Sequence, residues 1–214
     1  QKIINNSISC TGTGIHISSF DSSSIIGNRI FGNRIAIHMH SMASKVDVIN
    51  NTIRDNDIAG IYLHTFCCCR GSRIVGNVIS NNGEGIRLEW IICFLRDNTL
   101  VNNSLEVGGW YSECYEQDID SSNTINGKPI YYWMNQQDKT VPLDAAYVAL
   151  VNCKNIIVEN LTLTGTGGLK VVSTTDSTIR NLSISNDLYG FTLLESKRNR
   201  IYGNNITDCR IPII

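Results

Sequence analysis

The sequence predicts an all-β solenoid, a parallel β-helix of about nine coils, and three observations predict it. A phrase of the form Ile-x-(Asn/Gly/Asp)-(Asn/Leu)-x-Ile recurs along the whole 214-residue chain. A second phrase, an alternating apolar pair often led by glycine, follows most copies by about nine residues. Gly, Asn, Asp and Ser, which tolerate turn and left-handed conformations, lie between the phrases. No segment has the 3.6-residue spacing of an amphipathic helix.

The first phrase predicts one corner of every coil. Its copies lie at residues 3–8, 25–30, 48–53, 74–79, 95–100, 123–125, 158–163, 179–184 and 201–206. Its fourth position recurs at steps of 22, 23, 26, 21, 25, 38, 21 and 22 residues, and such periods are typical of solenoids. We expect the asparagine at this position to point inward and bond the asparagine of the next coil, because an unpaired buried amide costs about 1–3 kcal/mol. Leu161 and Leu182 should fill the same position with hydrocarbon.

The second phrase predicts a further strand in each coil. Its copies lie at residues 14–17, 37–39, 60–63, 85–88, 148–150, 168–171 and 190–193. Apolar residues alternate there with period two, which indicates a strand with one buried face. Each strand should pair with its equivalent one coil away, about 4.8 Å along the axis.

One step in the repeat is longer than the others. The 38 residues from position 123 to position 161 include a run of three aromatic residues, Tyr131-Tyr132-Trp133, and two of the three prolines. We expect residues 126–145 to form a lateral, hairpin-like excursion from a single domain that spans residues 1–214.

The two phrases, together with residues 126–133, 144–153 and 155–163, resemble a known family. They are similar to the NosD-like right-handed parallel β-helix repeats of archaeal secreted and surface proteins, also grouped as carbohydrate-binding and sugar-hydrolase repeats. The resemblance covers essentially the whole chain and implies right-handed winding and an extracellular or cell-surface location. Its members include sugar-binding, lyase-like, surface-layer-like and copper-site-maturation proteins, and the chain shows no catalytic motif of the family.

Composition excludes some classes of function. The net charge of −1 and the 17% of charged residues give no basic footprint for nucleic acid. The chain has no run of 18 apolar residues, which would predict a membrane span, and no charged leader at its start. Because both ends fall inside strand phrases, we expect either a segment of a longer surface protein or a subunit that stacks end to end into a fibre.

Two features predict processing outside the cell. Six Asn-x-Ser/Thr sequons occur, at Asn5, Asn50, Asn102, Asn160, Asn181 and Asn205. They predict a glycoprotein, although sequons also arise by chance where Asn and Thr are common. The eight cysteines are an even number and favour disulfides, whose connectivity the sequence does not give. Cys93 and Cys153 could equally be buried as small apolar residues.

All four histidines fall on one predicted outer face. His16 and His38 take the same strand position one coil apart, and Tyr62 and Arg87 follow them in that column. The neighbouring column contains Ser18, His40, His64 and Glu89. His16, His38, His40 and His64 could together hold copper or zinc, with residues 67–69, all cysteines, entering from the next turn. The alternative, which we favour, is that they are solvated or contact a glycan.

Aromatic residues and carboxylates suggest carbohydrate recognition. The candidate glycan contacts are Tyr62, Arg87, Trp90, Trp110, Tyr131 and Trp133. The aromatic residues among them could instead pack the excursion onto the solenoid. The candidate carboxylates for sugar hydrolysis are Glu84, Glu89, Asp55 and Asp57, but the acidic residues are too scattered for a lyase, so we favour a protein that is not an enzyme.

The sequence therefore predicts a non-enzymatic extracellular or cell-surface scaffold, a self-stacking fibre or surface-layer component with glycan-binding capacity. One alternative is a polysaccharide-active lyase or hydrolase, and another is a periplasmic or extracellular copper-handling protein. The expected partners are further copies of the chain or neighbouring domains, and glycans. No nucleic acid is expected, and no cofactor apart from copper or zinc under the metal alternative.

Overall fold

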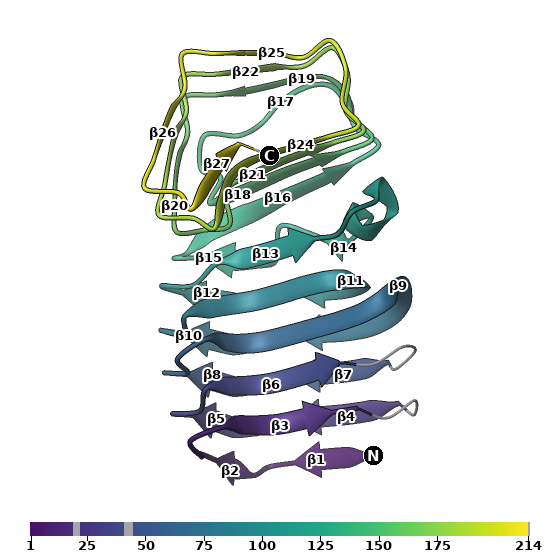
Figure 1. Ribbon diagram of the computed structural model, residues 1–214, viewed down its shortest axis with the longest axis vertical. Coiled ribbons are helices and arrows are strands. Elements are labelled where there is room, and N and C mark those ends of the chain that lie inside the picture. The colour runs from purple at the N-terminus through teal and green to yellow at the C-terminus, as the bar shows by residue number, and fades with distance from the viewer. Residues whose placement is uncertain (19–21, 41–44, 214) are drawn as a thin grey trace. The chain divides into compact units, whose positions relative to one another are not determined.

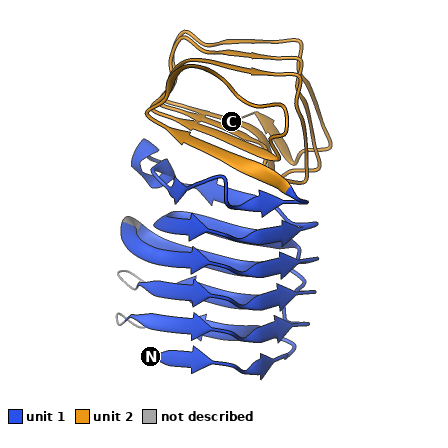
Figure 2. Cartoon of the chain, turned by 180° about the vertical axis from the view of Figure 1, so that it is seen from behind, with its two compact units in different colours: residues 1–127 blue, residues 128–214 orange. Residues whose placement is uncertain are grey.

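The protein is a parallel β-solenoid of about nine turns, which confirms the predicted fold class (Figure 1). The computed structural model describes residues 1–18, 22–40 and 45–213, and excludes the side chains of residues 67 and 68. The chain divides into two compact units, residues 1–127 and 128–214 (Figure 2). Each unit is described by itself, and the prediction of a single domain stays a prediction.

Three stacks of parallel strands form unit 1. The first contains β1 (Lys2–Ile4), β4 (Ser23–Ile26), β7 (Val46–Ile49), the second halves of β9 (Ala59–Val75) and β11 (Glu84–Arg96), and β14 (Asp118–Ile119). The second contains β2 (Ser7–Ile8), β5 (Arg29–Phe31), β8 (Thr52–Arg54), β10 (Val78–Ser80), β12 (Thr99–Val101) and β15 (Thr124–Ile125). The third contains β3 (Thr13–Ile17), β6 (Ile35–His40), the first halves of β9 and β11, and β13 (Leu105–Gly108). A short 3-10 turn, η1 (Ser112–Tyr115), follows β13.

Branched aliphatic residues fill the interior of unit 1 in columns. On the second stack, Ile30 pairs with Ile53 and Ile53 with Ile79, and none of the three is exposed. On the third stack, Ile37 and Ile61 are paired and fully buried in the same way. Each such side chain contributes about 2 kcal/mol by leaving water, so the repeated isoleucines are the main source of stability of this unit.

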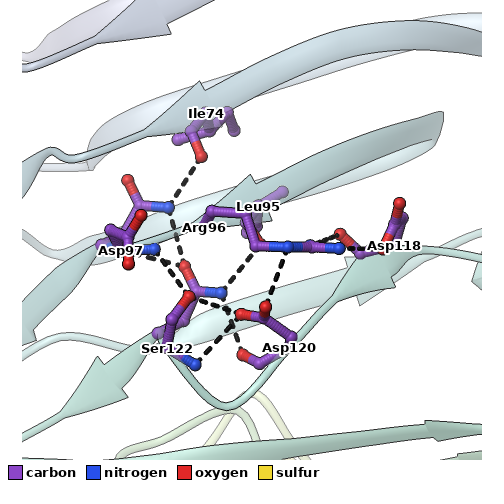
Figure 3. A network of polar contacts seen from close by, with 9 residues as sticks. Ile74, Leu95, Arg96, Asp97, Asp118, Asp120 and Ser122 are labelled. Atoms are coloured by element: carbon purple, nitrogen blue, oxygen red, sulfur yellow. Dashed lines mark hydrogen bonds and ion pairs between the residues drawn. The ribbon is translucent and has the colours of Figure 1, made fainter.

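An asparagine ladder lines the corner between the first and second stacks, as predicted. Its members are Asn6, Asn28, Asn51, Asn77, Asn98 and Asn123. Each of the first five donates its backbone N–H and its side-chain Nδ2 to the Oδ1 of the next, at 2.8 to 3.2 Å. The amides also bond strand carbonyls, as Asn98 does with Ile74 O at 2.8 Å and Asn123 with Leu95 O at 2.9 Å (Figure 3). The buried amides are thus paired on both sides, as their cost of burial requires.

Charged residues surround the last rungs of this ladder. The Arg96 guanidinium lies between the carboxylates of Asp118 and Asp120, with Nε 2.9 Å from Asp120 Oδ2 (Figure 3). Ser122 accepts a hydrogen bond from the backbone N–H of Asp97 at 2.9 Å. Since the two aspartates are largely exposed, these ion pairs contribute about 1 kcal/mol or less each.

A second asparagine ladder, which the sequence interpretation missed, lines the corner between the second and third stacks. Its members are Asn33, Asn56, Asn82 and Asn103, and Cys10 caps it by donating its backbone N–H to Asn33 Oδ1 at 2.8 Å. The signal was present in the sequence, because each of these asparagines follows a member of the first ladder by five residues. The two ladders fix two of the three corners of the coils in unit 1 that contain both, from Asn28 to Asn103.

Unit 2 also winds in three parallel stacks. One contains β16 (Lys128–Met134), β18 (Tyr147–Val151), β21 (Leu169–Val172), β24 (Tyr189–Leu194) and β27 (Ile211–Ile213). Another contains β17 (Gln137–Thr140), β19 (Lys154–Glu159), β22 (Thr178–Arg180) and β25 (Arg200–Tyr202). The third contains β20 (Thr162–Thr164), β23 (Ser183–Ser185) and β26 (Asn205–Thr207). Leu161 and Leu182 are buried in the core of this unit, as predicted.

The prediction of a hairpin-like excursion over residues 126–145 is wrong for the strands in that range. β16 pairs in parallel with β18, and β17 pairs in parallel with β19, whereas a hairpin would pair antiparallel. The long step of the repeat contains one additional short winding, because Ile130 pairs with Tyr147 only 17 residues later. This winding lacks the Asn phrase, so the repeat did not reveal it.

Candidate functional site

The outer side of the third stack in unit 1 gathers all four histidines, as predicted. His16 pairs with His38, His38 with Tyr62, and Tyr62 with Arg87, on β3, β6, β9 and β11 in turn. In the next outward column, His40 pairs with His64 and His64 with Glu89. We call the residues His16, His38, His40, Tyr62, His64 and Phe66 the histidine face. Their order follows from strand alternation, which turns every second residue outward.

The rings of the histidine face contact one another from coil to coil. Ring centroids are 5.2 Å apart between His16 and His38, and 5.1 Å apart between His38 and Tyr62, which are stacked. His40 and His64 are 4.9 Å apart, with their Nδ1 atoms at 3.1 Å, so one nitrogen donates and the other accepts. Phe66, which is 52% exposed, lies 5.0 Å from His40. The result is a continuous surface of aromatic rings over three coils.

A polar network borders this surface on β11. Tyr62 donates its hydroxyl to Glu89 Oε2 at 2.6 Å, and Arg87 donates Nε to Glu89 Oε1 at 2.9 Å. Arg87 also reaches Glu84 at 3.3 Å and lies 5.0 Å from the Tyr62 ring centroid. All four side chains are half-buried, so their mutual bonds hold them in fixed positions.

This network shifts the protonation of its members. Burial and the hydrogen bond to Glu89 raise the pKa of Tyr62 to about 12. Burial raises the pKa of Glu84 although Arg87 opposes it. Burial would also raise the pKa of Glu89, but the hydrogen bonds from Tyr62 and Arg87 outweigh it and the pKa of Glu89 is lowered. The two carboxyl groups therefore have different proton affinities although one guanidinium contacts both.

A second aromatic cluster follows directly after Glu89. Trp90 has a left-handed φ of 58°, at a shift in the pairing register between Glu89 and Ile91. Its ring lies 4.9 Å from Trp110 and 5.8 Å from Tyr111, and these two rings are 78% and 58% exposed. A bulky residue in this conformation costs about 1 kcal/mol or more, and such strain gathers at functional sites. Trp90 and Trp110 were predicted as glycan contacts, but no residue pattern predicted this shift in register, a β-bulge.

The other predicted contacts lie elsewhere. Tyr131 and Trp133 are on β16 in unit 2, where they pair with Val148 and Leu150 and pack against the core. Their packing matches the alternative in which aromatic rings cover the solenoid, and their role in glycan contact stays a prediction. Asp55 and Asp57, which are both exposed, lie in the turn between β8 and β9. Glu84 lies beside this turn, because its backbone N–H donates to Ile58 O at 2.7 Å.

The histidine face does not assemble a complete metal site from the described side chains. Among the residues that the structure describes, no group of three or more His, Cys, Asp and Glu side chains could hold a metal ion. The side chains of residues 67 and 68, which belonged to the predicted metal set, lie outside the description. Cys10, Cys93, Cys153 and Cys209 have free thiols. Cys93 and Cys153 are buried as small apolar residues, and burial raises the pKa of their thiols.

The six sequon asparagines all have exposed side chains. Five of them, Asn5, Asn50, Asn102, Asn160 and Asn181, take left-handed turn conformations. Asn205 begins strand β26. Exposure is required for glycosylation but does not establish it, so the modification stays a prediction.

Comparison with protein families agrees with the β-helical fold. Residues 1–137, more than half of the chain, match the family described as right handed beta helix region. The chain belongs to this family. The right-handed β-helix assignment confirms the expected winding, while an archaeal origin and a surface location stay predictions.

The C-terminal part of this β-helix protein has a second match. Residues 130–214 match the family described as periplasmic copper-binding protein (NosD), which supports the predicted NosD-like repeats. No curated protein and no solved structure matches the chain. In the described residues there is no helix of the length and apolar character needed to cross a membrane.

Proposed function

We propose that this β-helix protein is an extracellular or cell-surface scaffold that binds carbohydrate along the histidine face. The observation that carries the proposal is the row of rings stacked from coil to coil, which ends at a fixed network of two carboxylates and a guanidinium. Aromatic rings pack against the apolar faces of sugar rings, and preformed polar groups bind their hydroxyls. Exposed sequons and a match to a family described as periplasmic support a location outside the cytoplasm.

The proposal predicts that exposed rings next to the network contribute to binding. Replacing Trp110 with alanine should weaken the binding of a polysaccharide by about two- to tenfold, because one stacked ring contributes about 0.5–1.5 kcal/mol. Phe66→Ala should have a similar effect on the other side of the site. Both rings are mostly exposed, so neither substitution should lower the unfolding temperature. A glycan array followed by calorimetry with the best ligand measures the change.

Tyr202→Ala is the matched control, because Tyr202 is an exposed aromatic residue on β25 in unit 2. It should leave the affinity unchanged. If Trp110→Ala and Phe66→Ala bound the selected glycan as tightly as the unchanged protein, the proposed site would be wrong. If no polysaccharide bound at all, carbohydrate binding itself would be rejected.

A sugar hydrolase is the enzymatic alternative, and the opposite pKa shifts of Glu84 and Glu89 favour it. Glycosidases separate a protonated acid from an ionised carboxylate in this way. Against it, Arg87 contacts both carboxyl groups, which occupies the oxygens that would have to reach the substrate. Release of reducing ends from the bound polysaccharide, abolished by Glu84→Gln, would establish the enzyme and displace the scaffold proposal.

A copper-handling protein is the alternative that the second family match favours. The described residues do not fit a full site, because only the His40–His64 pair brings two ligand atoms together and none of the four histidines lies within the matched segment. Titration with copper(I) under reducing conditions separates the alternatives. Tight binding of one ion, lost in His64→Gln, would support copper handling.

End-to-end assembly into a fibre stays a prediction. Electron microscopy of native material tests it, since regular filaments would support stacking and dispersed particles would count against it.

A further inference from the structure

The histidine face brings four titratable imidazole rings together on one small surface. His16, His38, His40 and His64 occupy three adjacent coils, and neighbouring ring centroids are 4.9 to 6.3 Å apart. Histidine is the side chain whose charge changes between about pH 5 and 8. Protonation would therefore place several positive charges on one small surface.

The titratable and charged groups that border the cluster come from two strands. β9 contributes Tyr62, and β11 contributes Glu84, Arg87 and Glu89, while β3 and β6 contribute only the histidines themselves. Glu89 is the nearest carboxylate, and it already accepts hydrogen bonds from Tyr62 and Arg87. In the described part of the chain, no ion pair joins a carboxylate to any of the four histidines. Among the described residues, the cluster therefore has no carboxylate in a direct ion pair with it.

Two histidines of the cluster resist protonation. Burial, together with the neighbouring His16, His40 and His64, lowers the pKa of His38. Burial also lowers the pKa of His64, although the charge of Glu89 opposes this. In the His40–His64 pair, the 3.1 Å contact between Nδ1 atoms holds one proton, and a second proton would set two donors against each other. Burial and the neighbouring rings therefore both disfavour the charged forms of His38 and His64.

We infer that the histidine face binds anionic polysaccharide, and that it takes up protons when it does so. The inference rests on the proposed carbohydrate site and adds the class of its ligand and its dependence on pH. Carboxylates or sulfates spaced along a polymer would supply counter-ions to the protonated histidines. Rings of the neutral face would still contact the sugar, so pH would control the strength of binding rather than its place.

The direction of the pH dependence follows from linkage. A bound anion favours the charged imidazolium, so the histidine pKa is higher in the complex than in the free protein. Affinity is then highest below the pKa of the free protein and is lost as pH rises through the pKa of the complex. Between these two values, each proton taken up changes the affinity about tenfold per pH unit.

The inference is tested with the 214-residue protein and two ligands that share one sugar backbone. One is a polygalacturonate oligomer, and the other is its methyl ester, which lacks the charge. We expect the acidic oligomer to bind at least about tenfold more tightly near pH 5 than near pH 8. The ester should show no such change. Calorimetry in two buffers of different ionisation enthalpy counts the protons taken up.

Substitutions then locate the effect. His38→Gln and His64→Gln should each reduce the number of protons taken up and flatten the pH dependence, and the outward position of both side chains should preserve the fold. Arg54→Gln, which removes a permanent cation from β8 outside the face, is the matched control and should leave the pH profile intact.

The outcomes separate the two proposals. Equal binding of acid and ester at every pH would overturn the anionic ligand class while leaving carbohydrate binding in place. Binding of the acidic oligomer with an unchanged pH profile in both histidine variants would overturn the role of the cluster. Binding of neither oligomer, with a neutral glycan bound instead, would likewise overturn the inference alone.

Discussion

Replacing Asn77 with alanine should destabilise unit 1 by about 4 kcal/mol, because it breaks the first ladder in its middle. Asn77 Oδ1 accepts both the backbone N–H and the side-chain Nδ2 of Asn51, at 2.9 and 3.0 Å. Its own Nδ2 donates to Asn98 Oδ1 at 3.0 Å and to Val48 O at 2.8 Å. Since none of these groups can reach water, alanine would leave several buried polar atoms without partners. Urea unfolding measures the change as a lower midpoint at constant slope.

Asn6→Ala is the matched control for this ladder. Asn6 occupies the first rung, where its side chain is exposed and donates to Asn28 Oδ1 at 3.1 Å. Water can replace the bonds lost there, so we expect a cost below about 1 kcal/mol. Equal losses at the two positions would show that the ladder does not act through buried hydrogen bonds.

The same ladder shows how much of the fold the sequence predicts. In a solenoid, residues one period apart lie in one column, so the repeated phrase predicted the inward asparagines, the isoleucine columns and the histidine columns. The second ladder obeys the same rule and was accessible from the five-residue offset. Column membership is therefore predictable wherever the phrase is intact.

Two kinds of feature were beyond that rule. The winding of β16 and β17 has its own shorter period and no Asn corner, so the long step predicted a lateral, hairpin-like excursion instead of a coil. β9 and β11 continue as strands through a corner, and the bulge at Trp90 within β11 shifts the pairing in a way that no residue type announces.

For the candidate site, too, some features were predictable from the repeat and others were not. Its columns could be predicted, because backbone register determines which residues share a face. Its contacts could not, because the bonds from Arg87 to both carboxylates depend on side-chain conformations that spacing does not fix. Tyr131 and Trp133, which the sequence also predicted as glycan contacts, are partly buried against the core of unit 2, and their contact with a glycan stays a prediction.

Replacing Gly85 with alanine should destabilise unit 1 by about 2–3 kcal/mol, although it adds a single methyl group. Gly85 follows Glu84 on β11, and a Cβ atom there would lie 2.7 Å from Ser104 O and 2.8 Å from Asn103 Cβ. Ser104 O accepts the backbone N–H of Ile86 at 3.1 Å, and Asn103 belongs to the second ladder. The methyl group can be accommodated only if one of these ordered contacts moves.

Gly12→Ala separates this clash from a general effect of losing glycine. A Cβ at Gly12 would meet no atom within 4 Å, so alanine should be neutral there or slightly stabilising through the unfolded chain. Urea unfolding of both variants, with hydrogen exchange of the amides of β11 and β13, distinguishes the two causes. If Gly85→Ala unfolded at the same urea concentration as Gly12→Ala, the close approach of neighbouring coils would not constrain this column. A loss confined to Gly85→Ala, with faster exchange at Ile86, would mean that the spacing between coils is set by backbone contact as well as by the asparagine ladders.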